Sequence, residues 1–191
     1  VGFRWLVTVA ATQAVANMFN ATDKFRDRAC PSWNSSSNCN NIFADSPDGR
    51  RTGGLLSDHR GSGAAGRSFG DGFHHAGTVT SYASSLGNIE GAEWKFPIRY
   101  LYRRRMTDSA GAGRFRGGAT SEVALTPHGV GSFDLKLTNT AGTEQTNAHG
   151  IDGGFPGAGS QSVIVRDANP TFLNGKPRSF PAITEMGGTI C

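Results

Sequence analysis

The sequence has little cysteine and little charge. Its 191 residues include three cysteines, Cys30, Cys39 and Cys191. Because this odd, sparse set does not resemble the cysteine framework of a secreted disulfide-rich domain, we expect a reducing, cytoplasmic location. Charged residues make up 18% of the chain and the formal net charge is +4, a field too weak to point to nucleic acid as a partner.

Three further features are missing. No hydrophobic run reaches the ~18 to 20 residues that a membrane-spanning helix needs, so we expect no membrane partner. No phosphate-binding loop of the Gly-x-x-x-x-Gly-Lys-Ser/Thr type occurs, so any ATP would have to bind to another chain. The first residue is Val1 rather than methionine, from which we expect a processed chain or a part of a longer one.

Glycine, in contrast, is abundant. The chain contains 27 glycines, roughly twice the usual share. They do not recur at every third position, which excludes collagen. The 12 Phe and 3 Trp residues supply the apolar material that a disordered chain lacks. We therefore expect many tight turns, bulges and close backbone contacts.

The first 30 residues predict an amphipathic helix. No proline or glycine occurs from Phe3 to Cys30, and Pro31 is expected to end the helix. A signal peptide is the alternative, with Arg4, the apolar run Trp5 to Ala11 and a small-residue site at Ala14 to Ala16. An apolar face that continues beyond this site favours the helix, and its residues are Val7, Ala11, Ala14, Val15, Met18 and Phe25.

The rest of the chain predicts a β-rich body. We expect an α+β fold with a long N-terminal amphipathic helix in segment 1–31, a polar loop over 32–54 and a mostly β, glycine-turn-rich domain over 55–191. The segment Asn88 to Arg105 has the pattern of an extended chain, with Pro97 at an edge or a kink. Further strand candidates are Thr78 to Tyr82, Ser121 to Leu125, Gly131 to Leu137 and Ser162 to Val165.

Two motifs suggest ligands only weakly. Gly61 to Gly66 has the glycine spacing of a dinucleotide fingerprint, but neither the strand nor the helix that the fingerprint requires flanks it. Asp71, His74 and His75 are candidates for a metal site, since a carboxylate and imidazoles suit borderline cations. Adjacent histidines on a strand point to opposite faces, so an incidental surface pair is the competing interpretation.

Basic and acidic residues alternate in the middle of the chain. The run Arg103 to Arg105 and the pair Arg114 and Arg116 could form a nucleic-acid footprint, but a larger basic face is missing. Internal ion pairing or a subunit contact is the better interpretation, and the nearby carboxylates are Glu90, Glu93, Asp108 and Glu122. Glu90 and Glu93 are also the weak candidates for paired catalytic carboxylates.

One combination of motifs is much more specific. Asn88 to Glu93 has the pattern Asn-x-Glu-x-x-Glu, and Asp108 to Gly118 is a glycine-arginine turn after a Phe-Pro pair. With Asp71-Gly72 upstream and Gly153 to Gly157 downstream, this order resembles the hydantoinase B/5-oxoprolinase family over about residues 54 to 160. Ala110 departs from the usual glycine of the turn.

Within that family, the runs Tyr100 to Arg105 and Glu144 to Gly150 are similar to the large, alpha-type subunit of acetone and acetophenone carboxylases, in its C-terminal portion only. The resemblance implies ATP-dependent carboxylation of a ketone by bicarbonate through phosphorylated intermediates. It implies ATP on a hydantoinase A-like partner subunit and a divalent metal, Mn or Zn, outside this chain. Further implied partners are the remaining part of the hydantoinase B-like subunit and a small accessory subunit.

Two other functions share these motifs. The chain could belong to an ATP-dependent hydantoinase, 5-oxoprolinase or lactamase that hydrolyses a cyclic amide, or it could be a non-catalytic structural module of such a complex. Asp108, Arg114 and Arg116 are the candidate site residues. The arginines would either brace neighbouring loops by pairing with Glu90 or Glu93, or bind bicarbonate or a phosphorylated intermediate.

Overall fold

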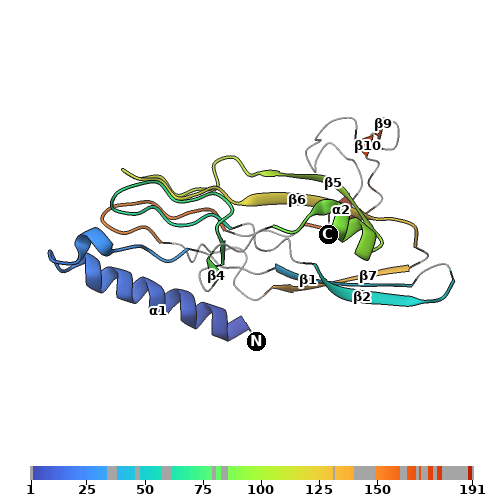
Figure 1. The fold of residues 1–191 in the computed structure, drawn as a ribbon, viewed down its shortest axis with the longest axis horizontal. Coiled ribbons are helices and arrows are strands. Elements are labelled where there is room, and N and C mark those ends of the chain that lie inside the picture. Colours follow the sequence, from blue (N-terminus) through green and yellow to red (C-terminus); the bar gives the residue numbers. More distant parts are fainter. Residues whose placement is uncertain are drawn as a thin grey trace.

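The protein has an α+β fold in a computed structural model (Figure 1). The structure describes residues 2–33, 38–45, 48–56, 62–78, 81–82, 86–130, 132–139, 149–159, 163–166, 168, 172–173, 176–177 and 189–190. Within these ranges the strands pair antiparallel, and none of the helices has the length and hydropathy to cross a membrane.

The N-terminal helix is shorter than predicted. Helix α1 spans Gly2–Asn20 and a short 3-10 helix, η1, spans Arg26–Arg28, so one continuous helix to Pro31 is wrong. The amide of Thr22 already bonds to the Phe19 carbonyl, three residues back. Thr22 and Asp23 are poor helix formers, and the carboxylate of Asp23 opposes the negative end of the helix dipole.

The apolar face that the sequence predicts for α1 does not face the core. Val7, Val15 and Met18 are 48%, 49% and 67% exposed, whereas Val9 and Ala16, on the opposite side of the helix, are buried. Val9 packs with Trp33, and the partly buried side chains of Cys30, Ala64 and Ala65 lie against them. Helix α1 therefore packs against the rest of the molecule through Val9 and Ala16, on the side opposite to the predicted apolar face.

A three-stranded antiparallel sheet occupies most of the segment predicted as a loop over 32–54. Its strand order is β2-β1-β7, and its strands are β1 (Asn38–Asp45), β2 (Arg51–Leu56) and β7 (Ser132–Asn139). The loop prediction is wrong because β1 pairs along its whole length with β7, far away in the sequence. This pairing supplies hydrogen-bond partners to the backbone of β1, although β1 is poor in residues that favour strands.

The segment predicted as extended over Asn88 to Arg105 begins with a helix. Helix α2 spans Ile89–Lys95, and the side chain of Asn88 caps it by accepting a hydrogen bond from the Glu90 amide. Pro97 then precedes β5 (Ile98–Arg105), which pairs with β6 (Ser121–Pro127) and has an irregularity between Tyr100 and Tyr102. The strands predicted around Ser121 and Gly131 are confirmed by β6 and β7.

The main core joins these elements. Ile42 of β1 and Leu56 of β2 pack with Phe96, Ile98 and Tyr100, and partly buried residues of α2 and β6 complete the cluster. The two sheets and α2 thus enclose one apolar core. This core lies toward the right of Figure 1.

The other strands are short. The expected strand Thr78 to Tyr82 is instead an antiparallel pair, β3 (Gly77–Thr78) and β4 (Ser81–Tyr82). Of the expected strand Ser162 to Val165, only Val165 lies in a strand, and Ser162 lies outside the described residues. The remaining pairs are β8 (Val165–Arg166) with β11 (Thr189–Ile190) and β9 (Phe172–Leu173) with β10 (Lys176–Pro177).

Candidate functional site

Three glycine-rich segments lie side by side at the end of the molecule where α1 finishes (Figure 1). We call residues 62–77, 106–120 and 149–159 the first, second and third glycine segments. The amides of Gly72 and Gly118 bond across the first two segments, to the carbonyls of Arg116 and Ala64 at 2.8 and 2.7 Å. The Phe155 amide bonds to the Ala112 carbonyl at 2.8 Å and joins the third segment to the second.

Glycine permits this close packing. A Cβ atom on Gly63, Gly72 or Gly118 would lie under 3.0 Å from backbone atoms of the neighbouring segment, and one on Gly111 would meet the carbonyl of Phe155. Real side chains do not make such contacts. None of these four glycines has a positive φ, so of the roles that the sequence suggested for glycine, these four serve the close approach of backbones and not the turn conformations.

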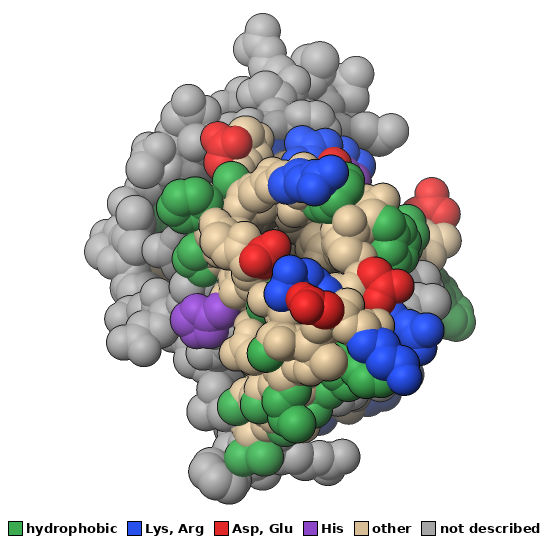
Figure 2. All heavy atoms as spheres, turned by 90° about the vertical axis from the view of Figure 1, so that its left-hand side faces the viewer, with side chains coloured by type: hydrophobic (Ala, Val, Ile, Leu, Met, Phe, Trp, Pro, Cys, Tyr) green, Lys and Arg blue, Asp and Glu red, His purple; other side chains and the backbone are tan. Residues whose placement is uncertain are grey.

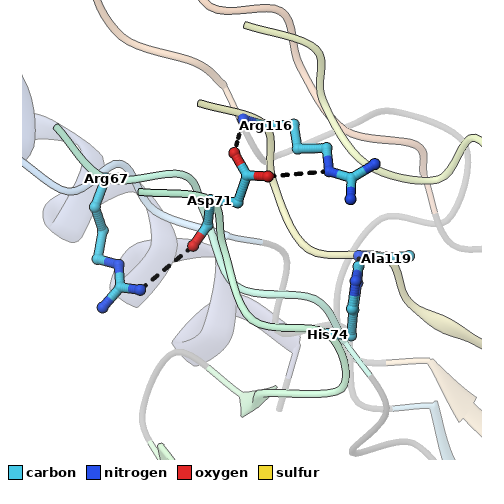
Figure 3. A network of polar contacts seen from close by, with 5 residues as sticks. All are labelled: Arg67, Asp71, His74, Arg116 and Ala119. Carbon is cyan, nitrogen blue, oxygen red and sulfur yellow. Dashed lines mark hydrogen bonds and ion pairs between the residues drawn. The ribbon is translucent and has the colours of Figure 1, made fainter. Parts of the chain in front are cut away.

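Asp71 connects the first two segments. Its Oδ1 atom accepts a hydrogen bond from the Arg116 amide at 3.0 Å, and its Oδ2 atom accepts one from Arg116 Nε at 3.2 Å (Figure 3). The Asp71 carbonyl accepts a further bond from the Arg67 guanidinium at 3.3 Å. Arg116 thus braces the first glycine segment, which agrees with one of the two interpretations of this residue from the sequence, namely that it pairs with a carboxylate of a neighbouring loop.

The carboxylate that pairs with Arg116 is not the expected one. Glu93 accepts a 2.7 Å hydrogen bond from the Tyr100 amide, and Glu90 lies in the exposed first turn of α2. Figure 1 places α2 away from the glycine segments. Pairing of Arg116 with Glu90 or Glu93 is therefore wrong, because the turn of residues 108–118 lies against the first glycine segment and not against α2.

Asp108 and Arg114 are exposed on the second segment. Asp108 has a φ of 54°, and the Arg114 guanidinium lies 5.5 Å from the centre of the Phe115 ring. Next to Asp108, the buried Ser109 hydroxyl donates to the Met106 carbonyl at 2.9 Å and accepts from the Thr120 amide at 3.0 Å. Ser109 therefore connects Met106 and Thr120, the two ends of the second glycine segment. The sequence pattern did not single out this residue.

Two of the three weak metal candidates, Asp71 and His74, make other contacts in the structure. The Asp71 carboxylate is occupied by Arg116, and His74 Nδ1 accepts a 2.8 Å hydrogen bond from the Ala119 amide. The acceptor position of His74 Nδ1 is therefore taken by the Ala119 amide and is not available to a metal. Within the described ranges, no group of three or more His, Cys, Asp or Glu side chains gathers where it could hold a metal ion. The divalent metal that the family resemblance implies is expected outside this chain.

Within the basic run on β5, Arg104 forms an internal ion pair, which is one of the two outcomes that the sequence led us to expect. Arg104 Nε donates to Glu122 Oε2 at 2.7 Å, and the Tyr102 hydroxyl donates to Glu122 Oε1 at 3.0 Å. Burial, with help from the Glu122 hydrogen bond, raises the pKa of Tyr102 to about 12. The hydrogen bond from Arg104 holds the pKa of Glu122 below its ordinary value.

Charges of both signs are interleaved on the end face of the molecule. Figure 2 shows basic, acidic and hydrophobic side chains next to one another on this face. In the first glycine segment, the Arg67 guanidinium lies 4.9 Å from the ring centre of Phe69 and 4.5 Å from that of Phe73. These phenylalanines are exposed, as is Phe155 on the third segment. The face therefore offers guanidinium groups within a mixed polar and aromatic surface.

The fold is similar to that of a solved protein. A chain of acetone carboxylase, in a nucleotide-free structure from work on the mechanism of ATP-dependent acetone carboxylation, matches with a TM-score of 0.61 and 18% sequence identity. The match covers 72% of this chain and 18% of that chain, so the present sequence spans a minor part of the length of its structural relative. No curated protein matches. The family model for hydantoinase B/oxoprolinase matches residues 1–186, and the chain therefore belongs to the hydantoinase B/oxoprolinase family.

Proposed function

We propose that this chain is part of the large subunit of an ATP-dependent ketone carboxylase, a cytoplasmic hetero-oligomer that joins bicarbonate to a ketone through phosphorylated intermediates. The observation that carries the proposal is the fold shared with acetone carboxylase over 72% of the chain. Family membership over residues 1–186 supports the same type of complex.

In this proposal the chain supplies a rigid frame and two guanidinium groups. The glycine segments hold Arg114 and Arg116 on one loop, and the terminal nitrogens of Arg116 point away from Asp71 (Figure 3). Arginine suits planar oxyanions such as bicarbonate and phosphoryl groups. Because Asp71 fixes the Nε side of Arg116, the outer edge of its guanidinium is positioned to meet an anion.

The remaining chemistry is assigned to other parts of the complex. ATP would bind to a hydantoinase A-like subunit, and a Mn or Zn ion would be held by the remaining part of the hydantoinase B-like subunit, with a small accessory subunit as a further partner. Phosphorylated intermediates hydrolyse in water, so transfer between subunits would need a shielded path. Glu90 and Glu93 lie apart from the arginines, and we assign them no catalytic step.

A second candidate is ATP-dependent hydrolysis of a cyclic amide. The family description itself names hydantoinase and oxoprolinase, which favours this alternative. The same frame would then present its arginines to the carboxylate or phosphorylated carbonyl of a ring substrate. A non-catalytic structural role is the third possibility, in which the frame contributes to assembly alone.

One experiment on the native complex separates these functions. Radiolabelled bicarbonate is supplied with acetone or acetophenone, with and without ATP, and ring opening of hydantoin and 5-oxoproline is measured in parallel. We expect ATP-dependent incorporation of label into an acid-stable carboxylate. Ring opening without incorporation would replace the first proposal by the second.

Arg116→Lys then tests the role of the frame, because lysine keeps the charge but loses the planar fork. We expect a loss of activity of about tenfold or more in a complex that assembles normally. Arg50→Lys, an exposed site in the β1–β2 connection, is the matched control and should keep full activity. Loss of assembly in Arg116→Lys would instead support the structural role.

A further inference from the structure

Helix α1 presents a second apolar face to solvent. Val7, Ala11, Ala14, Val15 and Met18 are all exposed. At 3.6 residues per turn they fall within an arc of roughly 100°. Val9 and Ala16 are buried on the opposite side, where Val9 packs with Trp33. The helix is thus apolar on two sides, and only one of them is covered. We call the five exposed residues the outer stripe.

The surroundings of the outer stripe are unusual for a helix face in water. No charged residue occurs between Arg4 and Asp23, whereas the solvent side of a surface helix normally carries charged side chains. Met18 is 67% exposed, and Phe19 beside it is 40% exposed. The absence of charge makes the outer stripe suitable for burial against another apolar surface.

The spacing within the stripe selects the type of partner. Val7, Ala11, Ala14 and Met18 are separated by four, three and four residues, which is the heptad seam along which one helix packs against another. Alanine at the two central positions allows the partner backbone to approach closely, near the lower end of the usual ~8 to 10 Å between helix axes. A second α-helix with small and aliphatic side chains is therefore the complementary shape.

The size of the stripe favours a partner within the same folded unit. From Val7 to Met18 the helix rises about 16 Å, and a stripe about 10 Å wide covers on the order of a few hundred Å². Stable interfaces between separate proteins bury about 800 Å² per partner. The stripe alone is too small to hold a second copy of the chain, but it is large enough for a helix that is already held nearby.

We propose that the outer stripe of α1 is the docking surface for a helix from the remaining part of the hydantoinase B-like subunit. The comparison with acetone carboxylase supports this choice of partner. The match covers only 18% of the acetone carboxylase chain, so a subunit of that type contains much additional structure that would pack against the present chain. The proposal depends on the partner assignment made above and not on which reaction the complex performs.

A photocrosslinking experiment on the native complex tests this. The photoreactive amino acid p-benzoylphenylalanine is placed at Val15, within the stripe, and in a separate variant at Ala10, which is exposed but lies outside it. After irradiation, we expect Val15 to crosslink to a helical peptide of the hydantoinase B-like subunit from outside residues 1–191. Position 10 should give at least tenfold less of that product.

Three results would overturn the proposal: crosslinks from position 15 to a second copy of residues 2–20, crosslinks to another subunit, or no protein crosslink at all. The adjacent substitutions Ala11→Glu and Ala10→Glu give an independent readout. Ala11→Glu should reduce the yield of assembled complex at least tenfold, and Ala10→Glu should keep it within twofold. Equal yields would also overturn the proposal. Carboxylation and ring-opening assays are not part of either readout, so this test can fail or succeed separately from the proposed function.

Discussion

The two ends of the molecule are held together in different ways. At the sheet end, apolar side chains of β1, β2, β5, β6 and α2 enclose a core in which Ile42 and Ile98 are almost fully buried. At the glycine end, three segments pack backbone against backbone, with hydrogen bonds between them and glycines where a Cβ would collide. The sheet end is held mainly by the packing of large apolar side chains, whereas the glycine end is held mainly by backbone contacts at positions without a side chain.

This difference changes the meaning of the glycine content. Glycine normally weakens a structure because it gains freedom in the unfolded chain. Here Gly63, Gly72, Gly111 and Gly118 allow segments to approach more closely than any other residue would. The resulting frame positions the Arg114 to Arg116 loop through these backbone contacts and through the Asp71 side chain, and the small apolar cluster of Val9 and Trp33 packs against Ala64 and Ala65 of its first segment. Precise placement of a guanidinium needs a fixed backbone, which these contacts provide.

The largest effect is expected at the sheet end. Ile98 is 2% exposed in the main core. Ile98→Ala removes buried methyl groups and leaves a cavity, so the free energy of unfolding should fall by about 3 kcal/mol. Ile164→Ala, at a residue that is 39% exposed, is the control and should change it by less than about 0.5 kcal/mol. Urea unfolding measures both, and equal losses would contradict this picture of the core.

At the glycine end, adding a methyl group should have the second largest effect. Gly118→Ala places a Cβ against the Phe73 carbonyl, and we expect a loss of about 2 kcal/mol in the free energy of unfolding. Gly70→Ala, in the same frame but with open space around it, should be neutral or stabilise by about 0.5 kcal/mol. A neutral Gly118→Ala would show that the segments are not packed closely.

The connection between the segments should have a smaller effect. Asp71→Asn keeps an oxygen for the Arg116 amide but loses the charge that attracts Arg116 Nε. Because both side chains are more than half exposed, we expect a cost of about 0.5 to 1 kcal/mol. Asp23→Asn, in an even more exposed pair with Arg26, should cost less. Thermal unfolding compares the two variants, and a larger loss for Asp23→Asn would contradict the bracing role of Asp71.

The smallest effect concerns the surface of β5 and β6 and depends on pH. Arg104 lowers the pKa of Glu122 in the folded state, so the folded state favours the ionised carboxylate. The stability that results is present above the pKa of the unfolded glutamate and is lost as the pH falls through the lower, folded value. Glu122→Gln should therefore cost about 0.5 kcal/mol at pH 7, and the cost should fall as the pH is lowered to 3. A loss that persists unchanged at pH 3 in urea unfolding would exclude the charge as its cause.

The elements that could be predicted are those with a strong local pattern. The absence of proline and glycine predicted α1, and the alternation of Phe133, Leu135 and Leu137 predicted β7. Periodicity could not show which side of α1 is buried, because apolar residues occur on both sides. Strand β1 is rich in asparagine and forms through pairing with β7, which is a contact that local propensity does not contain.

The candidate site was predictable in kind but not in detail. The sequence left two interpretations for the arginines of the turn over residues 108–118, bracing of a loop or binding of an oxyanion, and Arg116 makes a bracing contact. Its partner Asp71 lies 45 residues away in the sequence. Their contact depends on two glycine segments lying side by side, which is a tertiary arrangement. The capping of α2 by Asn88 was the one local signal that could have corrected the extended prediction for that segment.

Native-state hydrogen exchange tests the central claim most directly, namely that the glycine segments form a rigid frame. The amides of Gly72 and Gly118 donate the hydrogen bonds that join the first two segments, and the backbone of β5 and β6 provides the internal reference. The account predicts that both glycine amides exchange within about tenfold of the slow β5 and β6 amides. Exchange of Gly72 and Gly118 at the rate of an unstructured peptide, while β5 and β6 remain protected, would contradict it.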